Sequence, residues 1–135
     1  MEAIVAPIDD MAALERVVAA SAHEPNSGLI VMPDAFTIGH HEDITSSIAR
    51  YRVPTVYPFR IFAEVGGLVS YGSSALDEFW RAASYADRIL KGAKPSELPV
   101  QTPIKFDLAI NLKTAKALGL DVPSSIRLRA DEVIE

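Results

Sequence analysis

Short apolar runs alternate along the chain with segments whose apolar residues recur at helical spacing. The runs predict strands at residues 2–8, 29–33, 53–59 and 67–72, and a stretch in which apolar and polar residues alternate predicts another at 104–110. Helical spacing predicts helices at about 11–23, 40–50, 75–91 and 112–118, with one helical turn at 61–67. This alternation indicates an α/β sandwich, Rossmann-like, with a mostly parallel sheet of about five strands.

Capping residues mark the starts of several predicted helices. Asp9 or Asp10 precedes the first helix, where a carboxylate can accept hydrogen bonds from the free amides of the first turn. Ser74 with Asp77 resembles a capping box, and Asn111 precedes the last helix. Glycines follow the ends of the last two helices, at Gly92 and Gly119.

Composition narrows the class of protein. The 135 residues suit one domain, residues 1–135, and 49% hydrophobic with 23% charged residues indicates an ordered globular chain. A net charge of −5, with the 13 basic residues scattered, argues against a nucleic-acid partner. The chain has no cysteine, no apolar run near the length of a membrane span, and no export signal at its start.

Polar and aromatic residues follow the predicted strands, beginning with Asp34. In open α/β sheets, ligands bind outside the carboxyl ends of the strands. Asp9 and Asp10, Asp34, residues 57–60 and residues 70–72 would share one rim if the strands are parallel. For Asp34 two interpretations stay open, because a carboxylate after proline also satisfies the amides of a turn.

Other constellations favour structural roles. Residues 40–43 are His-His-Glu-Asp, a set of side chains that could bind a metal. Adjacent residues of a helix point about 100° apart, however, whereas a chelating pair on a helix is spaced i and i+4. A solvated helix start is therefore the better interpretation. The glycines of residues 65–72 lack a phosphate-binding pattern, and Ser70 lacks the context of a hydrolase nucleophile. Phe79 and Trp80 lie in a helical apolar stripe that is typical of a core or an interface.

Longer stretches of the sequence resemble a known family. The patterns "SYGSSALDEFWRAASYADRILKGAKPSELPV" and "KFDLAINLKTAKALGL", together with "GLIVMPDAFTIGHHEDITSSIARYRVPTVYPFR", resemble the tryptophan/tyrosine-type substrate-binding proteins of ABC transporters. The resemblance implies one lobe of a type I periplasmic-binding-protein fold, the C-terminal one. It also implies no catalysis and no cofactor, a periplasmic location, and delivery of a small solute to an ABC permease.

This chain differs from the family pattern in length. Members are expected to be about twice as long, with an export or lipoprotein signal, a first lobe, and an opening strand and helix of the second lobe. The resemblance makes residues 2–8 the outer strand of the lobe, with the absent strand between it and residues 29–33. The helix at 75–91 would normally pack on the first lobe, so its Phe79–Trp80 stripe would be exposed. We therefore expect a homodimer, or a domain-swapped assembly, that buries this helix.

The resemblance also implies ligand-binding positions at the rim. They are Asp34, Ala35, Phe36, Pro58, Phe59, Ser70 and Tyr71. Asp34 would suit the amino group of an amino-acid-like solute, and Phe59 and Tyr71 would suit an aromatic ring, as in an aromatic amino acid. A single lobe offers half of the cleft, whereas ligands are normally buried between two walls.

Two other functions stay open at this point. A receiver-like signalling domain would carry a phosphoryl group on Asp34, with Asp9 and Asp10 as its acidic pair. A truncated structural remnant would only self-associate.

Overall fold

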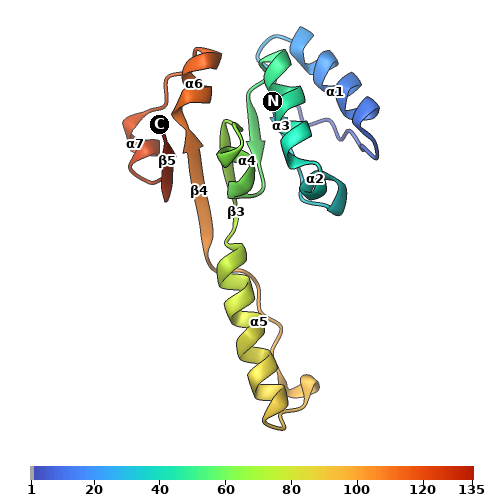
Figure 1. Ribbon diagram of the computed structural model, residues 1–135, viewed down its shortest axis with the longest axis vertical. Coiled ribbons are helices and arrows are strands. Elements are labelled where there is room, and N and C mark those ends of the chain that lie inside the picture. The colour runs from blue at the N-terminus through green and yellow to red at the C-terminus, as the bar shows by residue number, and fades with distance from the viewer. Residues whose placement is uncertain (1) are drawn as a thin grey trace.

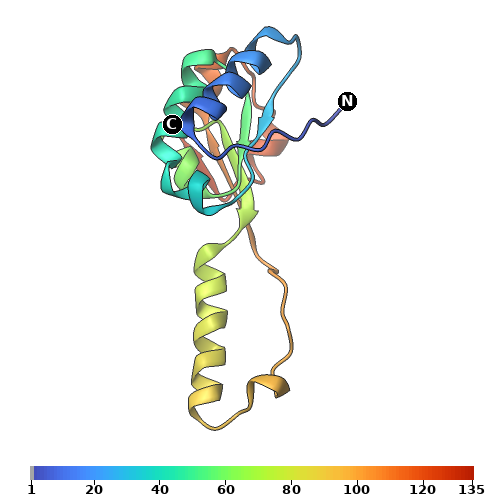
Figure 2. The same ribbon diagram turned by 90° about the vertical axis from the view of Figure 1, so that its right-hand side faces the viewer.

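A five-stranded sheet organises the computed structural model, which describes residues 2–135, with helices on both sides of the sheet (Figures 1 and 2). The strands are β1 Leu29–Ile30, β2 Thr55–Tyr57, β3 Val69–Ser73, β4 Phe106–Asn111 and β5 Glu132–Ile134. They are ordered β1-β2-β3-β4-β5. The first three are parallel, and β4 and β5 are parallel to each other but antiparallel to β3. The predicted α/β sandwich with a mostly parallel sheet is confirmed.

Seven α-helices and one 3-10 turn accompany the strands within residues 2–135. They are α1 Met11–His23, α2 Ala35–Gly39, α3 His41–Tyr51, α4 Arg60–Glu64, α5 Ala75–Leu90, η1 Pro95–Glu97, α6 Leu112–Leu118 and α7 Ser124–Arg127. Helices α1 to α4 cover one face of the sheet, and α7 lies on the other side (Figure 2). We call the face covered by α1 to α4 the helix face.

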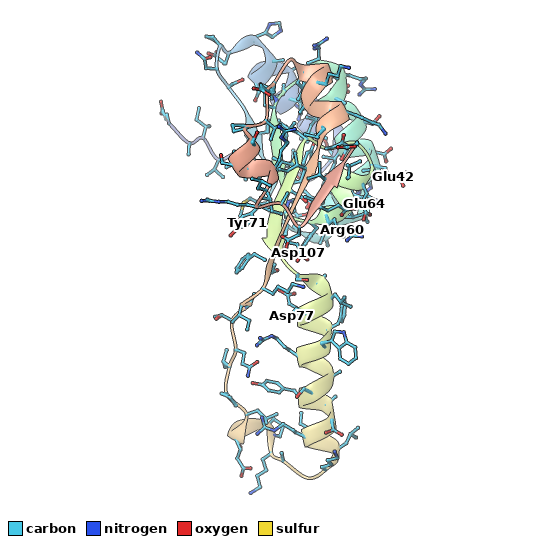
Figure 3. The ribbon with its side chains drawn as sticks, turned by 90° about the vertical axis from the view of Figure 1, so that its left-hand side faces the viewer. Glu42, Arg60, Glu64, Tyr71, Asp77 and Asp107 are labelled. Atoms are coloured by element: carbon cyan, nitrogen blue, oxygen red, sulfur yellow. The ribbon has the colours of Figure 1, made fainter. Side chains whose placement is uncertain are left out.

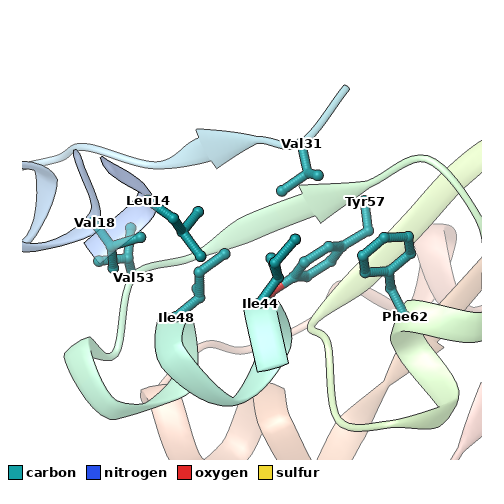
Figure 4. Packing of buried hydrophobic residues seen from close by; sticks show 8 residues of the cluster. All are labelled: Leu14, Val18, Val31, Ile44, Ile48, Val53, Tyr57 and Phe62. Carbon is teal, nitrogen blue, oxygen red and sulfur yellow. The ribbon is translucent and has the colours of Figure 1, made fainter. Parts of the chain in front are cut away.

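The core lies between the helix face and its helices (Figure 4). Helices α1 and α3 each contribute two side chains, strand β2 contributes Tyr57, and α4 contributes Phe62. The tyrosine and phenylalanine rings stack with centroids 5.1 Å apart. The buried cluster is Leu14, Val18, Val31, Ile44, Ile48, Val53, Tyr57 and Phe62. Burial of these apolar side chains is the main term that holds α1 and α3 on the sheet.

Several predicted helix boundaries are confirmed by their caps. The Asp10 carboxylate accepts a hydrogen bond from the Ala13 amide at 2.6 Å, and the Asn111 side chain accepts one from the Thr114 amide at 3.0 Å. Gly119 ends α6 in the left-handed conformation, with φ of 74°. The capping box predicted at Ser74 is wrong: its side chain caps nothing, and Asp77 pairs with Arg81 of the next turn at 2.7 Å.

Three further predictions need correction. Residues 2–8 form no strand and are almost wholly exposed, because β1 has no strand beside its outer edge to pair with them. The predicted helix at 40–50 is α3, and a separate short helix, α2, precedes it. Residues 132–134, for which the sequence pattern predicts no element, form β5 beside β4.

Helix α5 and its return segment, residues 75–105, project away from the sheet as an arm (Figures 1 and 2). None of the sixteen residues of α5 is buried. Phe79 and Trp80 are 75% and 71% exposed, as the resemblance led us to expect. The return segment contacts the opposite side of the helix, where Tyr85 donates its hydroxyl hydrogen to the Pro99 carbonyl and Arg81 donates to Gln101 at 3.0 Å.

Candidate functional site

The carboxyl ends of β1, β2 and β3 meet at the edge of the sheet nearest the arm (Figure 1). The three strands are parallel and in close register, with Ile30 beside Val56 and Tyr57 beside Ser70. The segments that follow β1 and β2 therefore lie at the same rim of the sheet, as the sequence predicts. We call this edge the carboxyl rim.

Asp34 lies on the carboxyl rim as the N-cap of α2. Its Oδ1 atom accepts a hydrogen bond from the Thr37 amide at 2.7 Å. In return, the Asp34 amide donates a hydrogen bond to the Thr37 hydroxyl oxygen at 3.0 Å. This reciprocal pair fixes the backbone just after β1. The capping role foreseen for Asp34 is thus present, and the exposed carboxylate still faces solvent.

The two residues after Asp34 differ in burial. Ala35 is exposed at the first position of α2. Phe36 is half-buried: it packs against the core cluster and its ring lies 4.5 Å from the His40 ring, centroid to centroid. Phe36 therefore anchors the rim while showing part of its ring to solvent.

The next rim segment, after β2, is held against β3 by close backbone packing. Pro58 is buried, and Phe59 is half-buried against the core cluster as the N-cap of α4. Gly72 of β3 allows this approach, because a Cβ at that position would lie 1.9 Å from the Pro58 carbonyl oxygen. A side chain at residue 72 would push the Pro58–Phe59 segment away from the sheet.

Ser70 and Tyr71 point to opposite faces of the sheet because they are consecutive residues of β3. Ser70 is buried on the helix face, where its Oγ atom has no hydrogen-bond partner among residues 2–135. Tyr71 is 59% exposed on the other face, away from Arg60 and Glu64 (Figure 3). The Tyr71 ring stacks on Phe106 of β4, with centroids 5.7 Å apart.

The structure thus brings some of the predicted site residues together and separates others. Asp34, Ala35 and Phe36 are contiguous on the carboxyl rim, and Pro58–Phe59 lies on the same rim. Phe59 packs on the helix face whereas Tyr71 lies on the other face, so the two rings do not line one surface. Ser70 is part of the interior.

One residue of this region was not among the predicted site residues, namely Phe106. The alternation of residues 104–110 already placed Phe106 on one face of its strand. The pairing of Ser73 with Phe106 and of Tyr71 with Leu108, which the sequence does not reveal, sets it beside Tyr71.

An ion-pair cluster lies at the start of α4. Arg60 donates to Glu64 at 2.7 Å and lies 3.1 Å from Glu132 of β5. The hydrogen bond that Arg60 donates to Glu64 and the negative charge of Glu132 raise the pKa of Arg60 above its ordinary value. The cluster links α4 to β5.

Within residues 2–135, no group of three or more histidine, aspartate or glutamate side chains is arranged to hold a metal ion. His40 and His41 instead place their Nδ1 atoms 2.9 Å and 3.0 Å from the carbonyls of Phe36 and Ile38.

The receiver-like interpretation requires an acidic pair at a strand end. Residues 2–8 form no strand, and Asp10 caps α1. Asp34 and the acidic pair therefore do not follow two strands of one sheet.

No helix within the described range of the chain is both long and apolar enough to traverse a lipid bilayer.

Comparison with known proteins identifies a family for this chain. The family model for ABC transporter substrate-binding proteins matches residues 1–134. None of the curated proteins compared with the chain matches it.

Three solved structures share the fold. An ABC domain in complex with L-Trp from Streptococcus pneumonia is 25% identical, with a TM-score of 0.79, and is matched over 91% of this chain and 40% of that one. A conserved domain protein from Vibrio cholerae is 24% identical, with a TM-score of 0.78, over 90% of this chain and 41% of that one. A ligand-free, open substrate-binding protein with adhesive properties from Clostridium difficile is 20% identical, with a TM-score of 0.63, over 94% and 42%. The chain thus spans about two fifths of the length of these structures.

Proposed function

This chain belongs to the family of ABC transporter substrate-binding proteins, and we propose that its carboxyl rim forms one wall of a site for a small, amino-acid-like solute. The observation that carries the proposal is Asp34. It is an exposed carboxylate held in a fixed position by the Thr37 amide, beside the half-exposed ring of Phe36. The neighbouring structure from Streptococcus pneumonia, in complex with L-Trp, supports an amino acid as the solute.

The chemistry of the rim suits a zwitterion with an apolar body. The Asp34 carboxylate would accept hydrogen bonds from the ammonium group of the solute, and charge-assisted hydrogen bonds of this kind are stronger than neutral ones. Phe36, and the part of Phe59 that the core leaves open, would contact the side chain of the solute. Ala35 adds exposed surface beside Asp34, and the buried Pro58 fixes the position of Phe59, whereas Tyr71 on the opposite face and Ser70 in the interior lie apart from this wall.

The proposed role in the cell follows from the family, whose members are periplasmic or extracellular solute-binding proteins. We propose the same location for this chain, an ABC permease as its partner, and no catalysis. A single wall buries less of a solute than a closed cleft does, so we expect affinity in the millimolar range for the chain alone.

The arm gives the proposal a second part, a homodimer through α5. Four large apolar side chains of α5 are strongly exposed, and uncovered apolar patches of this kind mark interaction surfaces. They are Leu76, Phe79, Trp80 and Leu90, which we call the α5 stripe. A second copy of the chain would supply a complementary stripe.

Calorimetric titration with L-tryptophan tests the solute-binding proposal, with the Asp34→Asn variant as the decisive comparison. Asparagine caps a helix about as well as aspartate does, so the fold should remain while the attraction for an ammonium group is lost. We expect a fall in affinity of about tenfold, the equivalent of one charge-assisted contact. The matched ligand is 3-indolepropionate, which lacks the ammonium group and should bind both proteins equally and weakly.

Two results would count against solute binding at Asp34. One is equal affinity of the wild-type protein and the Asp34→Asn variant for L-tryptophan. The other is a saturable signal for 3-indolepropionate as strong as that for L-tryptophan.

A further inference from the structure

A groove of about 410 Å³ separates α3 from α6 on the helix face of the sheet. It contains none of the residues proposed to bind the solute. In Figure 1, α3 and α6 lie on either side of the upper part of the sheet, at the end opposite the arm. The groove is lined by Thr45, Ile48, Ala49, Arg52, Val53, Thr55, Tyr57, Gly66, Leu68, Lys113, Thr114, Ala117 and Leu118. Its volume is within the range of small-molecule sites, about 300–1,000 Å³.

The two helices that flank the groove belong to different packing units. Helix α3 packs against α1 and α4, whereas α6 packs against β5. A contact bridges them at the mouth, where the guanidinium group of Arg52 donates to the Ala117 carbonyl. The walls are apolar, with Ile48 on the α3 side and Leu118 on the α6 side.

The inner end of the groove carries a buried hydroxyl group without a partner. Thr45 is 2% exposed, and no hydrogen bond of normal geometry satisfies its Oγ1 atom within the described part of the chain, although its hydroxyl lies close enough to that of Tyr57 to influence the pKa of the phenol. The neighbouring Thr55 hydroxyl donates to the Val53 carbonyl at 3.0 Å, and the Thr114 hydroxyl donates to the Gly66 carbonyl at 2.8 Å, so both are already satisfied. An unpaired buried hydroxyl is costly, and a ligand oxygen that reached Thr45 would remove that cost.

The mouth of the groove is cationic in an acidic protein. Arg52 and Lys113 line it, and no aspartate or glutamate does, although the whole chain carries a net charge of −5. Lys113 is exposed and makes no ion pair with any residue from 2 to 135. A negative group at the mouth would therefore find an unpaired ammonium group beside the guanidinium group of Arg52.

From this arrangement we infer that the groove between α3 and α6 is a second binding site, for a small organic monocarboxylate with an apolar body. The carboxylate would lie at the mouth between Lys113 and Arg52, and the apolar body would lie between Ile48, Leu68 and Leu118. A ligand that also carries an oxygen at its far end would bond to Thr45. A highly charged anion such as phosphate would leave the apolar walls unfilled, and a peptide would exceed the volume.

The experiment is a titration of the full chain, labelled with ¹³C at its methyl groups, with hexanoate and with phenylacetate, followed by NMR. We expect saturable shifts at the methyl groups of Ile48, Leu68, Ala117 and Leu118, with affinities near 1 mM. The two ligands distinguish an aliphatic from an aromatic body. Hexanamide, which has the same shape as hexanoate without its charge, should bind about tenfold more weakly.

Two pairs of variants make the test specific. Lys113→Glu should weaken hexanoate about tenfold, whereas Lys116→Glu, the same charge change on the same helix but outside the groove, should leave the affinity unchanged. Ala117→Phe should fill the groove from an exposed position and abolish the shifts. Thr45→Val removes the unpaired hydroxyl with little change of shape, so it should raise the melting temperature of the free protein. It should also weaken 6-hydroxyhexanoate while sparing hexanoate.

The inference would be overturned if neither carboxylate gave saturable shifts. It would also be overturned if Lys113→Glu and Lys116→Glu lowered the affinity for hexanoate equally. Shifts confined to Ala35 and other rim residues would assign the carboxylates to the solute site instead. Binding of L-tryptophan at the carboxyl rim is tested by calorimetry with the Asp34→Asn variant, whereas the groove is tested by NMR shifts of its own methyl groups. The two proposals can therefore fail independently.

Discussion

Gly72 lies where the chain leaving β2 passes closest to β3. Because a Cβ there would meet the backbone carbonyl of Pro58 at 1.9 Å, the strain cannot be relieved by a side-chain rotation. We expect Gly72→Ala to lower the free energy of unfolding by about 3 kcal/mol, at the upper end of the range for overpacking. Urea unfolding followed by circular dichroism measures this change.

Gly39 provides the matched control for this prediction. A Cβ at Gly39 would have nothing within 4 Å, and its backbone is helical. Gly39→Ala should change the unfolding free energy by less than about 1 kcal/mol, and in the stabilising direction. Equal tolerance of both alanines would mean that the backbones of Pro58 and residue 72 are not in contact.

Tyr57 makes the stability of the fold depend on pH in the alkaline range. Burial raises the pKa of Tyr57 to about 12, while the nearby hydroxyls of Thr55 and Thr45 act in the opposite direction. Between pH 10 and 12 the folded state then holds a proton that the unfolded state has lost, so stability falls as pH rises through this window. The fold should therefore lose about 3 kcal/mol of its unfolding free energy across this window, because the pKa of Tyr57 is raised from 10.0 to about 12 and each pKa unit corresponds to about 1.4 kcal/mol.

Urea unfolding of wild-type protein and Tyr57→Phe at pH 9 and pH 12 tests this effect. The wild type should lose more stability than the variant across the interval, because phenylalanine does not titrate. Parallel losses in the two proteins would show that Tyr57 ionises as freely in the fold as in the unfolded chain.

Sequence patterns predicted the local residue roles better than the tertiary ones. Asp10, Asn111 and Gly119 act at helix ends through short-range hydrogen bonds and backbone conformation, which local sequence determines. Ser74 fits the same pattern, yet it is buried at the base of the arm and caps nothing. The separation of Phe59 from Tyr71 depends on which face of the sheet each ring meets, and this follows from tertiary packing that sequence spacing does not encode.

At the scale of elements, α5 differs from the other long helices because nothing covers its apolar side. Its amphipathic pattern predicts a helix with one packed side, and the helix itself is present. Nothing within residues 2–135 covers this side of the helix. The same reasoning explains residues 2–8, which have the apolar character of a strand. Ile4 and Val5 remain exposed because β1 is a two-residue edge strand, and no strand pairs with its outer side within residues 2–135.

A charge on the α5 stripe should prevent the proposed homodimer without unfolding the protein. Trp80 is exposed and contributes nothing to the core cluster, so Trp80→Glu should leave the urea midpoint of the monomer unchanged. The variant should be monomeric at concentrations where the wild type is dimeric. Size-exclusion chromatography with light scattering makes the comparison.

Ala82→Glu is the control for the dimer prediction, because Ala82 is exposed on α5 but does not belong to the stripe. This variant should dimerise as the wild type does. A wild-type protein that stays monomeric at micromolar concentration would exclude the homodimer.

For the whole molecule, the exposed apolar surface is larger than the arm alone. On the sheet face opposite the helix face, Ile30 and Met32 are 73% and 69% exposed, and Val56 beside them is partly open. Within residues 2–135, this surface adds to the exposed apolar side chains of the α5 stripe. Uncovered apolar surface of this extent is typical of an interaction surface.

The body of the molecule should fold without the arm. Every residue of the core cluster lies outside residues 75–105, and the chain enters and leaves the arm through one antiparallel pair, Ser73 beside Phe106. We expect a variant in which Asn-Gly replaces residues 74–105 to unfold cooperatively in urea. A non-cooperative transition, or loss of the far-ultraviolet dichroism of the sheet and helices, would show that α5 is needed for folding.

The same strand pair has a practical use in protein engineering. Because Ser73 and Phe106 are adjacent across β3 and β4, a foreign insert whose ends lie close together could be grafted there as a cassette. The insert would be displayed next to the rim proposed to bind the solute. A reporter domain placed at this junction would then convert occupancy of the rim into an optical readout.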